Sequence, residues 1–469
     1  MGENKYKRLL KDILIFGLGN IGSKLILFLM VPLYTNYLNT EEYGVTELVY
    51  TFMQLIVPFV SLDIYDAAVR FGLSKQENKE DVLKTGFIVL LFGSGVTILL
   101  GPIIGLNQNL NAWKWHLVIY IILSMNLSLF QNYLKVKEKN LQYAIVSIIQ
   151  TISLASLNVL FLVVKDLGIS GYINSTLLSY VIALFISLIF GNVGSDLIRG
   201  KVNKRLLKEM IMYSSPLIFN NVSWWVVQSS DKLMVEQMIS AAALGIYTVS
   251  AKIPSLINVV TAIFQQAWGI STIKEIESSN DNKFYSNVFD ILQSSVFFVS
   301  ICIILIIKPF MSVYVENSFF EAWKYIPLLI IGAAFGATSA FFGNMYGALK
   351  KSTNSMWSTI FAAALNICIN FMLIPRIGIW GAVVGTAASY VAITIVRMID
   401  CYRYLSFEIH IGQFILNAVI ATMLAIVVSA GVTPYITSVI ALIIYIVLNR
   451  NNINGLFNMV RKIGLNRRG

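Results

Sequence analysis

The chain is a series of long apolar runs separated by short polar links. The hydrocarbon core of a bilayer is about 30 Å thick, so a membrane-spanning helix needs roughly 20 predominantly apolar residues. The runs are continuous rather than alternating, which favours helices over the strands of a membrane barrel. Fourteen spans are predicted, at residues 13–34, 46–71, 85–105, 115–134, 142–164, 170–191, 209–230, 243–268, 286–307, 324–347, 355–374, 379–399, 411–430 and 434–449.

The basic residues orient these spans. With the N-terminus placed in the cytoplasm, most of the 35 lysines and arginines fall in links on the cytoplasmic side, as the positive-inside rule requires. A missed or extra helix would invert every later link, so an even number of spans with both termini cytoplasmic is predicted. The net charge of +11 is then explained by basic loops beside an anionic leaflet, and nucleic acid is not an expected partner.

Composition agrees with a membrane environment and excludes several kinds of site. Hydrophobic residues make up 57% of the chain and charged residues 13%, whereas soluble domains carry about 25% charged residues. The three cysteines show no CxxC spacing and there are two histidines, so neither a disulfide framework nor a metal site is expected. The run at 13–34 is longer than the core of a cleavable signal peptide, and none is predicted.

Two pairs of short sequence blocks predict an internal repeat. Residues 167–171 (LGISG) are followed after seven residues by 179–181 (SYV), and residues 377–381 (IGIWG) are followed at the same spacing by 389–391 (SYV). A second correspondence joins 37–44 with 238–245, and the glycines in these blocks permit close helix contact.

The repeat predicts an all-α polytopic membrane protein of two lobes, related by an axis along the membrane normal and enclosing a central cavity. The predicted lobes are residues 1–200, with the first six spans and a basic linker, and residues 201–449. Within the second lobe, spans seven to twelve repeat spans one to six and two further spans follow. Residues 450–469 form a basic cytoplasmic tail.

Charged and amide side chains inside the spans are the candidate site, because a charge at mid-membrane costs about 2.5–3.5 kcal/mol on insertion scales. Lysine and arginine suit an anionic headgroup, and carboxylates can take up a coupling proton or sodium ion. The residues predicted to bind substrate are Lys24, Lys252, Arg70, Asn20 and Asp231, and those predicted to couple an ion are Asp63 and Asp66.

These residues also have structural interpretations, which the sequence leaves open. Asp66 and Arg70 have the i, i+4 spacing of an ion pair near the inner interface, and Asp231 suits a solvated or capping role at an outer helix end. Lys24 has the strongest functional case, because it is too central in its span to snorkel cheaply. Asparagines inside spans favour interhelical hydrogen bonds over ligand binding.

Seven short blocks along the chain form a recognisable set: Gly17-Leu18-Gly19-Asn20, Ser23-Lys24, Pro32-Leu33-Tyr34, Tyr43-Gly44, Ser230-Asp231-Lys232, Leu244-Gly245-Ile246-Tyr247 and Ala251-Lys252. Together they resemble the polysaccharide-biosynthesis flippases of the multidrug/oligosaccharidyl-lipid/polysaccharide exporter superfamily. The likeness extends along nearly the whole chain in helix count and layout. Lys24 and Lys252 lie within matching blocks, whereas Arg70 and Asp63 do not.

The resemblance implies a flippase of the bacterial cytoplasmic membrane that moves undecaprenyl-pyrophosphate-linked oligosaccharide units from the inner to the outer leaflet. It also implies a largely cationic cavity, coupling to H⁺ or Na⁺ without another cofactor, and membrane lipids and polysaccharide polymerase or assembly proteins as partners. No catalytic residues are expected, since the chain is read as a transporter rather than an enzyme.

Three alternatives stay open at this point. The sequence distinguishes poorly between a lipid II flippase and a capsule or O-antigen flippase. A drug/cation antiporter of the same superfamily would need a more acidic cavity. A membrane glycosyltransferase or polymerase is disfavoured, because the chain has no DxD motif and no large acidic outer loop. The absence of a GxxxxGK[ST] phosphate loop also argues against ATP hydrolysis.

Overall fold

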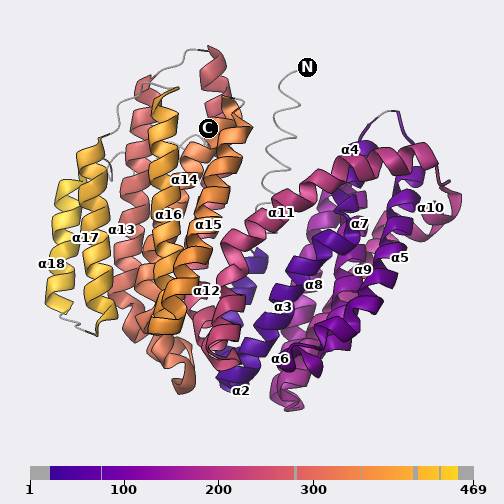
Figure 1. Cartoon of the computed structure of the whole chain (residues 1–469), viewed down its shortest axis with the longest axis horizontal. Coiled ribbons are helices and arrows are strands. Elements are labelled where there is room, and N and C mark those ends of the chain that lie inside the picture. Colours follow the sequence, from indigo (N-terminus) through magenta and orange to yellow (C-terminus); the bar gives the residue numbers. More distant parts are fainter. Residues whose placement is uncertain are drawn as a thin grey trace, which may run out of the picture. The chain divides into compact units, whose positions relative to one another are not determined.

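A computed structural model describes residues 22–74, 76–278, 282–349, 351–404, 410–431, 435–450 and 452. Across this part of the chain every regular element is a helix (Figure 1). Residues 22–29 are helical. The helices that follow are α2 (Val31–Tyr37), α3 (Thr40–Ser61), α4 (Ile64–Gly72), α5 (Lys79–Ile104), α6 (Gln108–Asn111), α7 (Lys114–Val136), α8 (Asn140–Asn158), the π-helix η1 (Val159–Val164), α9 (Gly168–Gly191), α10 (Val193–Arg199), α11 (Lys204–Met238), α12 (Ala241–Ser278), α13 (Asn282–Tyr314), the 3₁₀ helix η2 (Asn317–Lys324), α14 (Ile326–Ala348), α15 (Ser352–Ile377), α16 (Ile379–Tyr402), α17 (Ile411–Ser429) and α18 (Tyr435–Leu448).

Eleven helical segments in the described residues are long and apolar enough to cross a membrane. They coincide with the second to sixth and the eighth to thirteenth predicted spans, so the all-α, polytopic membrane fold is confirmed. Residues 13–21 of the first predicted span lie outside the described residues, and the rest of that span is helical apart from a turn at Met30. The last predicted span coincides with α18, which is apolar but has only 14 residues. The seventh predicted span is helical within α11, but its amide and hydroxyl side chains leave it less apolar than the eleven.

The two LGISG-like blocks have the same local structure. Each supplies a glycine of positive φ just where a helix begins: Gly168 (φ +52°) is the first residue of α9, and Gly378 (φ +62°) directly precedes α16. A side chain in this backbone region is strained, whereas glycine is not. Ser179 and Ser389, from the second halves of the blocks, each donate to a carbonyl of the preceding turn at 2.7 Å. The repeated residues therefore perform the same local tasks in α9 and α16.

Gly44 of α3 and Gly245 of α12 form a reciprocal contact between the other pair of repeated blocks. A Cβ atom on Gly44 would lie 1.8 Å from the Ala241 carbonyl oxygen, and one on Gly245 would lie 2.0 Å from that of Thr40. Helix backbones can approach this closely only where neither residue has a side chain. A capping box at the start of α3, in which Asn39 and Glu42 exchange hydrogen bonds, fixes where the helix reaches this crossing.

The described residues divide into two compact units: the first holds those up to residue 236 together with 240–245, and the second holds 237–239 and those from 246 onward. α11 belongs to the first unit because its side chains bond to α3 and to the junction of α3 with α4. The Trp225 indole donates to the Thr51 carbonyl at 3.2 Å, and Lys232 pairs with the buried Glu47 at 2.6 Å. Two repeat lobes with a boundary near residue 200 stay a prediction, and these compact units divide after α11 instead.

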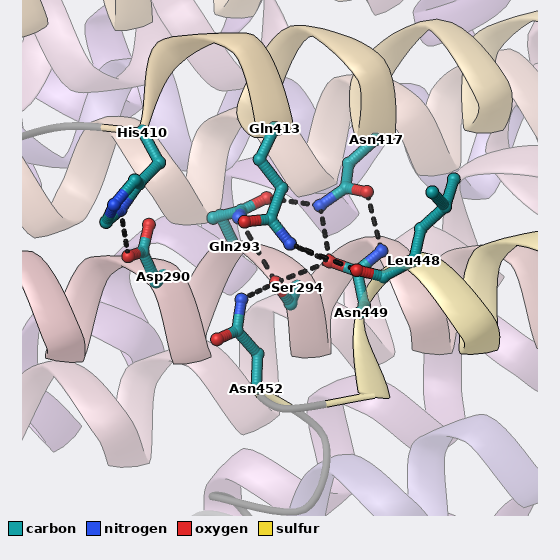
Figure 2. Close-up of polar contacts among 9 residues, drawn as sticks. All are labelled: Asp290, Gln293, Ser294, His410, Gln413, Asn417, Leu448, Asn449 and Asn452. Carbon is teal, nitrogen blue, oxygen red and sulfur yellow. Dashed lines mark hydrogen bonds and ion pairs between the residues drawn. The ribbon is translucent and has the colours of Figure 1, made fainter.

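A buried amide network joins three helices of the second unit (Figure 2). Asn417 of α17 donates to Gln293 of α13 and to Asn449, which follows α18, at 2.9 Å each, and Asn449 donates back at 2.7 Å. Beside the network, the His410 Nδ1 lies 2.7 Å from the Asp290 carboxylate. Polar groups buried in apolar surroundings stabilise a helix arrangement only when each finds a partner, so this network specifies how α13, α17 and α18 pack.

A buried carboxylate, Asp196 of α10, binds the end of α7 in the first unit. It accepts a hydrogen bond from the Tyr133 hydroxyl at 2.8 Å and pairs with Lys137, whose ammonium also donates to the Gly191 carbonyl at 2.6 Å. Burial raises the pKa of Asp196, but the hydrogen bonds from Lys137 and Tyr133 and the Lys137 charge outweigh it, so the pKa lies below its ordinary value. The ionised form is therefore the one that the fold stabilises.

This arrangement predicts a loss of stability in acid. The unfolded-state pKa is roughly 3.9 and the folded-state pKa is lower, so the contribution is complete above the unfolded value and disappears as the pH falls through the folded value. Asp196→Asn should melt at a lower temperature than wild type near neutral pH and show a shallower decline between about pH 5 and pH 3. Thermal unfolding of the purified proteins measures this. Asp166→Asn, which alters an exposed carboxylate, should follow the wild-type pH profile.

Candidate ligand-binding cavity

One face of α11 carries a cluster of amide and tryptophan side chains. Asn221, Trp224, Trp225, Gln228 and Ser229 are spaced at i, i+3, i+4, i+7 and i+8, which places them on one side of the helix. A lipid-facing helix has no use for such a face, because unpaired amides in hydrocarbon are costly. The spacing therefore indicates that this side of α11 faces protein or a polar cavity.

The structure places this face against a cavity of about 420 Å³ within the first unit. Four glutamines, one asparagine, three serines, two tryptophans and two tyrosines contribute to the lining, and none of the described lining residues is charged. Small-molecule sites typically have volumes of about 300–1,000 Å³. The side chains opposite α11 are Met53, Gln54, Val57 and Pro58 of α3, Tyr65 of α4, Ser124, Leu127, Ser128 and Gln131 of α7, Gln150 of α8 and Tyr180 of α9.

Asp63 lies behind this lining and positions two of its members. Its carboxylate accepts from the Tyr65 hydroxyl at 2.6 Å and from the Asn221 amide at 3.0 Å, and the residue is fully buried. Asp63 and the preceding Leu62 both have positive φ, 47° and 52°, where the chain turns from α3 into α4. Non-glycine residues adopt this region at an energetic cost, which the two side-chain hydrogen bonds offset here.

The other predicted site residues lie away from the cavity lining. Lys24 is exposed in the helical stretch 22–29 and Arg70 is exposed on α4, while Asp66 is half-buried within electrostatic reach of Lys135 of α7. Asn20 lies outside the described residues. The cavity in the first unit thus has no charged residue in its described lining, and the largely cationic central cavity that the resemblance implies stays a prediction.

Two further predicted residues sit in different units. Asp231 is buried in α11, next to the Lys232–Glu47 ion pair, and so is not the exposed cap that one reading proposed. Lys252 is half-buried in α12 and belongs to the second unit. The ligand and ion-coupling roles assigned to the seven residues stay predictions. Within the described residues, no three histidine, cysteine or carboxylate side chains converge as a metal-ligand set would.

Sequence reasoning missed the tryptophans and glutamines of the cavity. The signal was present in α11, where the i, i+3, i+4, i+7 spacing joins Trp224 and Trp225 to the amides of Asn221 and Gln228. Asparagines inside spans favour interhelical hydrogen bonds, and the tryptophans carry no charge that would single them out. The side chains from α3, α7, α8 and α9 become part of one site only through tertiary packing.

The chain is similar in fold to solved membrane transporters. The lipid II flippase MurJ in its inward closed conformation matches with a TM-score of 0.66 and 13% identity, covering 95% of this chain and 99% of MurJ. An inward-facing multidrug resistance MATE transporter of the MOP superfamily matches with a TM-score of 0.69 and 14% identity, covering 82% of this chain and 94% of that one. At such identities the likeness defines the class of fold.

The family follows from the sequence. The model of the polysaccharide biosynthesis protein family matches residues 9–269, and the chain belongs to this family. The predicted resemblance is thereby confirmed. An uncharacterized membrane protein of Haemophilus influenzae is 23% identical over 279 residues, which are 55% of this chain and 64% of that relative.

Proposed function

We propose that the chain is a flippase that moves undecaprenyl-pyrophosphate-linked oligosaccharide units from the inner to the outer leaflet of the bacterial cytoplasmic membrane. The observation that carries this proposal is the neutral cavity of amides, hydroxyls and tryptophans in a protein of the polysaccharide biosynthesis family. A hydrated headgroup needs such a surface to replace its water inside the bilayer. Purely apolar helices would serve only the lipid chain.

The physics of lipid transfer limits what the protein has to bind. Burying an acyl or prenyl chain is worth about 0.8 kcal/mol per CH₂, so extracting a long polyprenol from the bilayer would be prohibitive. The headgroup therefore enters the protein while the tail stays in lipid. Lys24 and Arg70, which are exposed cations of the first unit, suit the pyrophosphate, and alternating access driven by H⁺ or Na⁺ completes the proposed cycle.

Asp63 bears on the antiporter alternative. A site for cationic drugs needs a carboxylate that can face the ligand, and the one at this cavity is fully buried with both oxygens engaged by Tyr65 and Asn221. The lining therefore offers a cation no negative charge. This favours a polyhydroxylated headgroup over a cationic drug as the substrate.

Complementation tests the proposal. Expression in strains that lack a capsule or O-antigen flippase should restore surface polysaccharide in at least one of them, and Lys24→Ala should lower it by about tenfold or more, as expected for loss of a charge-assisted bond. Protein abundance is measured in parallel, and Lys201→Ala, which removes another exposed lysine, is the matched control. Full activity of Lys24→Ala would remove Lys24 from the substrate site. Drug resistance without polysaccharide export would support the antiporter instead.

A further inference from the structure

The polar side chains that line the cavity of the first unit are of two kinds: some are held by hydrogen bonds within the protein, and others are available to a ligand. The Trp225 indole nitrogen donates to the Thr51 carbonyl, and the Asn221 amide and Tyr65 hydroxyl donate to Asp63, so these three side chains are held in place. In contrast, Gln54 and Gln131 make no hydrogen bond to another residue that the structure describes. A rigid frame thus surrounds amides that can bind a ligand.

Gln228 and Trp224 extend the available groups along α11. Gln228 is exposed and Trp224 has 43% of its surface exposed, although both line a cavity rather than a lipid-facing ridge. Each glutamine amide offers two donors and an acceptor, which matches a sugar hydroxyl that both donates and accepts. An indole face is a large, rigid apolar surface that can stack on the C–H face of a pyranose ring.

The absence of charge among the described lining residues disfavours two other classes of ligand. A pyrophosphate carries several negative charges and is bound most strongly by charge-assisted hydrogen bonds from lysine or arginine, and neither residue type is among the described lining residues. A cation needs an accessible carboxylate, but that of Asp63 is fully buried and accepts hydrogen bonds at both oxygens. The remaining chemistry is that of an uncharged, polyhydroxylated ligand.

From this lining we infer that the cavity between α3, α7 and α11 is a carbohydrate subsite that binds uncharged sugar rings. Trp224 stacks on a ring and Gln54, Gln131 and Gln228 hydrogen-bond its hydroxyls. As part of the flippase cycle the subsite rests on the proposed function, and it separates recognition of the sugar from recognition of the pyrophosphate. Its choice among neutral sugars would then set which repeat unit the protein accepts.

Tryptophan fluorescence of the purified full-length protein tests this inference. The probes are a panel of uncharged oligosaccharides built from glucose, galactose, rhamnose and N-acetylhexosamines, with inorganic pyrophosphate and tetraphenylphosphonium as charged probes. At least one oligosaccharide should give a saturable change that neither charged probe competes away. Trp224→Ala should raise its Kd by about tenfold or more, and Trp224→Phe should restore most of the affinity because the ring is kept.

Two further variants separate a binding role from a folding role. Gln228→Ala changes an exposed side chain and should weaken saccharide binding while the melting temperature stays that of wild type. Trp115→Ala removes a half-exposed tryptophan of α7 that does not line the cavity, and it should leave the Kd unchanged. The inference is overturned if no oligosaccharide of the panel binds, if pyrophosphate or tetraphenylphosphonium occupies the site, or if Trp224→Ala binds as wild type does.

Binding and transport give distinguishable outcomes. Saccharide binding in a protein that fails to restore surface polysaccharide would keep the subsite and reject the flippase. In the converse outcome, the wild type restores surface polysaccharide while its Trp224→Ala and Gln228→Ala variants export normally and bind every saccharide as the wild type does. That outcome would keep the flippase and reject the subsite.

Discussion

Replacing Gly44 by valine should prevent α3 and α12 from crossing and leave little folded protein in the membrane. The added Cβ would meet the Ala241 carbonyl oxygen at 1.8 Å, and the backbone there cannot move without separating the two helices. Overpacking typically costs about 1–3 kcal/mol, and a clash with backbone on both helices belongs at or above the top of that range. The measurement is membrane abundance together with the thermal unfolding temperature in detergent.

The effect should follow the size of the side chain and the position. Gly44→Ala should be less damaging than Gly44→Val, and Gly245→Ala should resemble Gly44→Ala because its Cβ would lie 2.0 Å from the Thr40 carbonyl oxygen. Gly95→Ala of α5 is the control, since no atom lies within 4 Å of the added methyl group. Equal stability of Gly44→Ala and Gly95→Ala would show that the crossing can relax.

Arg397→Ala should cause a comparably large loss of stability in the second unit. Arg397 is only 4% exposed within α16, and its guanidinium donates to the hydroxyls of Ser339, Ser358 and Thr359 and to the carbonyls of Ser339 and Ser355. All five N–H groups are thus used on neutral acceptors. Leaving a buried neutral acceptor without its donor typically costs about 1–3 kcal/mol, and this substitution removes the donor from five acceptor atoms.

The Arg397→Lys variant distinguishes the contribution of the charge to stability from that of the hydrogen bonds. Arg397→Lys keeps the charge but offers three donors without the planar fork, so its melting temperature should fall between those of wild type and Arg397→Ala. Arg376→Ala, at the exposed end of α15, should leave the melting temperature close to wild type. An Arg397→Ala protein with the melting temperature of the wild type would contradict the structural role of Arg397. A charge inside a membrane helix is by default a functional candidate, and here its complete set of partners explains it structurally.

Several features of the fold were predictable from local sequence. Eleven of the predicted spans coincide with helices long and apolar enough to cross a bilayer, because helix formation in lipid depends mainly on the length of an apolar run. Gly168 and Gly378 were identified from repeated blocks and both take positive φ at helix starts. Gly44 and Gly245 were predicted to permit close helix contact, and they form one. Each of these features is encoded within a few consecutive residues.

The site was less predictable because its members are distant in sequence. Lys24, Asp63 and Arg70 were predicted as site residues because they are charged, yet only Asp63 lies at the cavity. It stands behind the lining and orients Tyr65 and Asn221. The residues that line the space are neutral glutamines, serines and aromatics, which in a membrane helix look like packing groups when read one helix at a time. Spacing along α11 shows which side chains share a face, but it does not show what lies opposite that face.

By itself, therefore, the sequence determined the membrane environment, the helical class, the family and the glycines that shape helix starts and crossings. Those properties depend on hydrophobic length and on backbone freedom, both of which are local. Only the tertiary structure decided that α11 packs with the first unit, that Arg397 has five neutral acceptors, and that six helices supply a cavity with no charge among its described lining residues. These depend on contacts between residues more than a hundred positions apart in the case of α11 and α3, which no local pattern records.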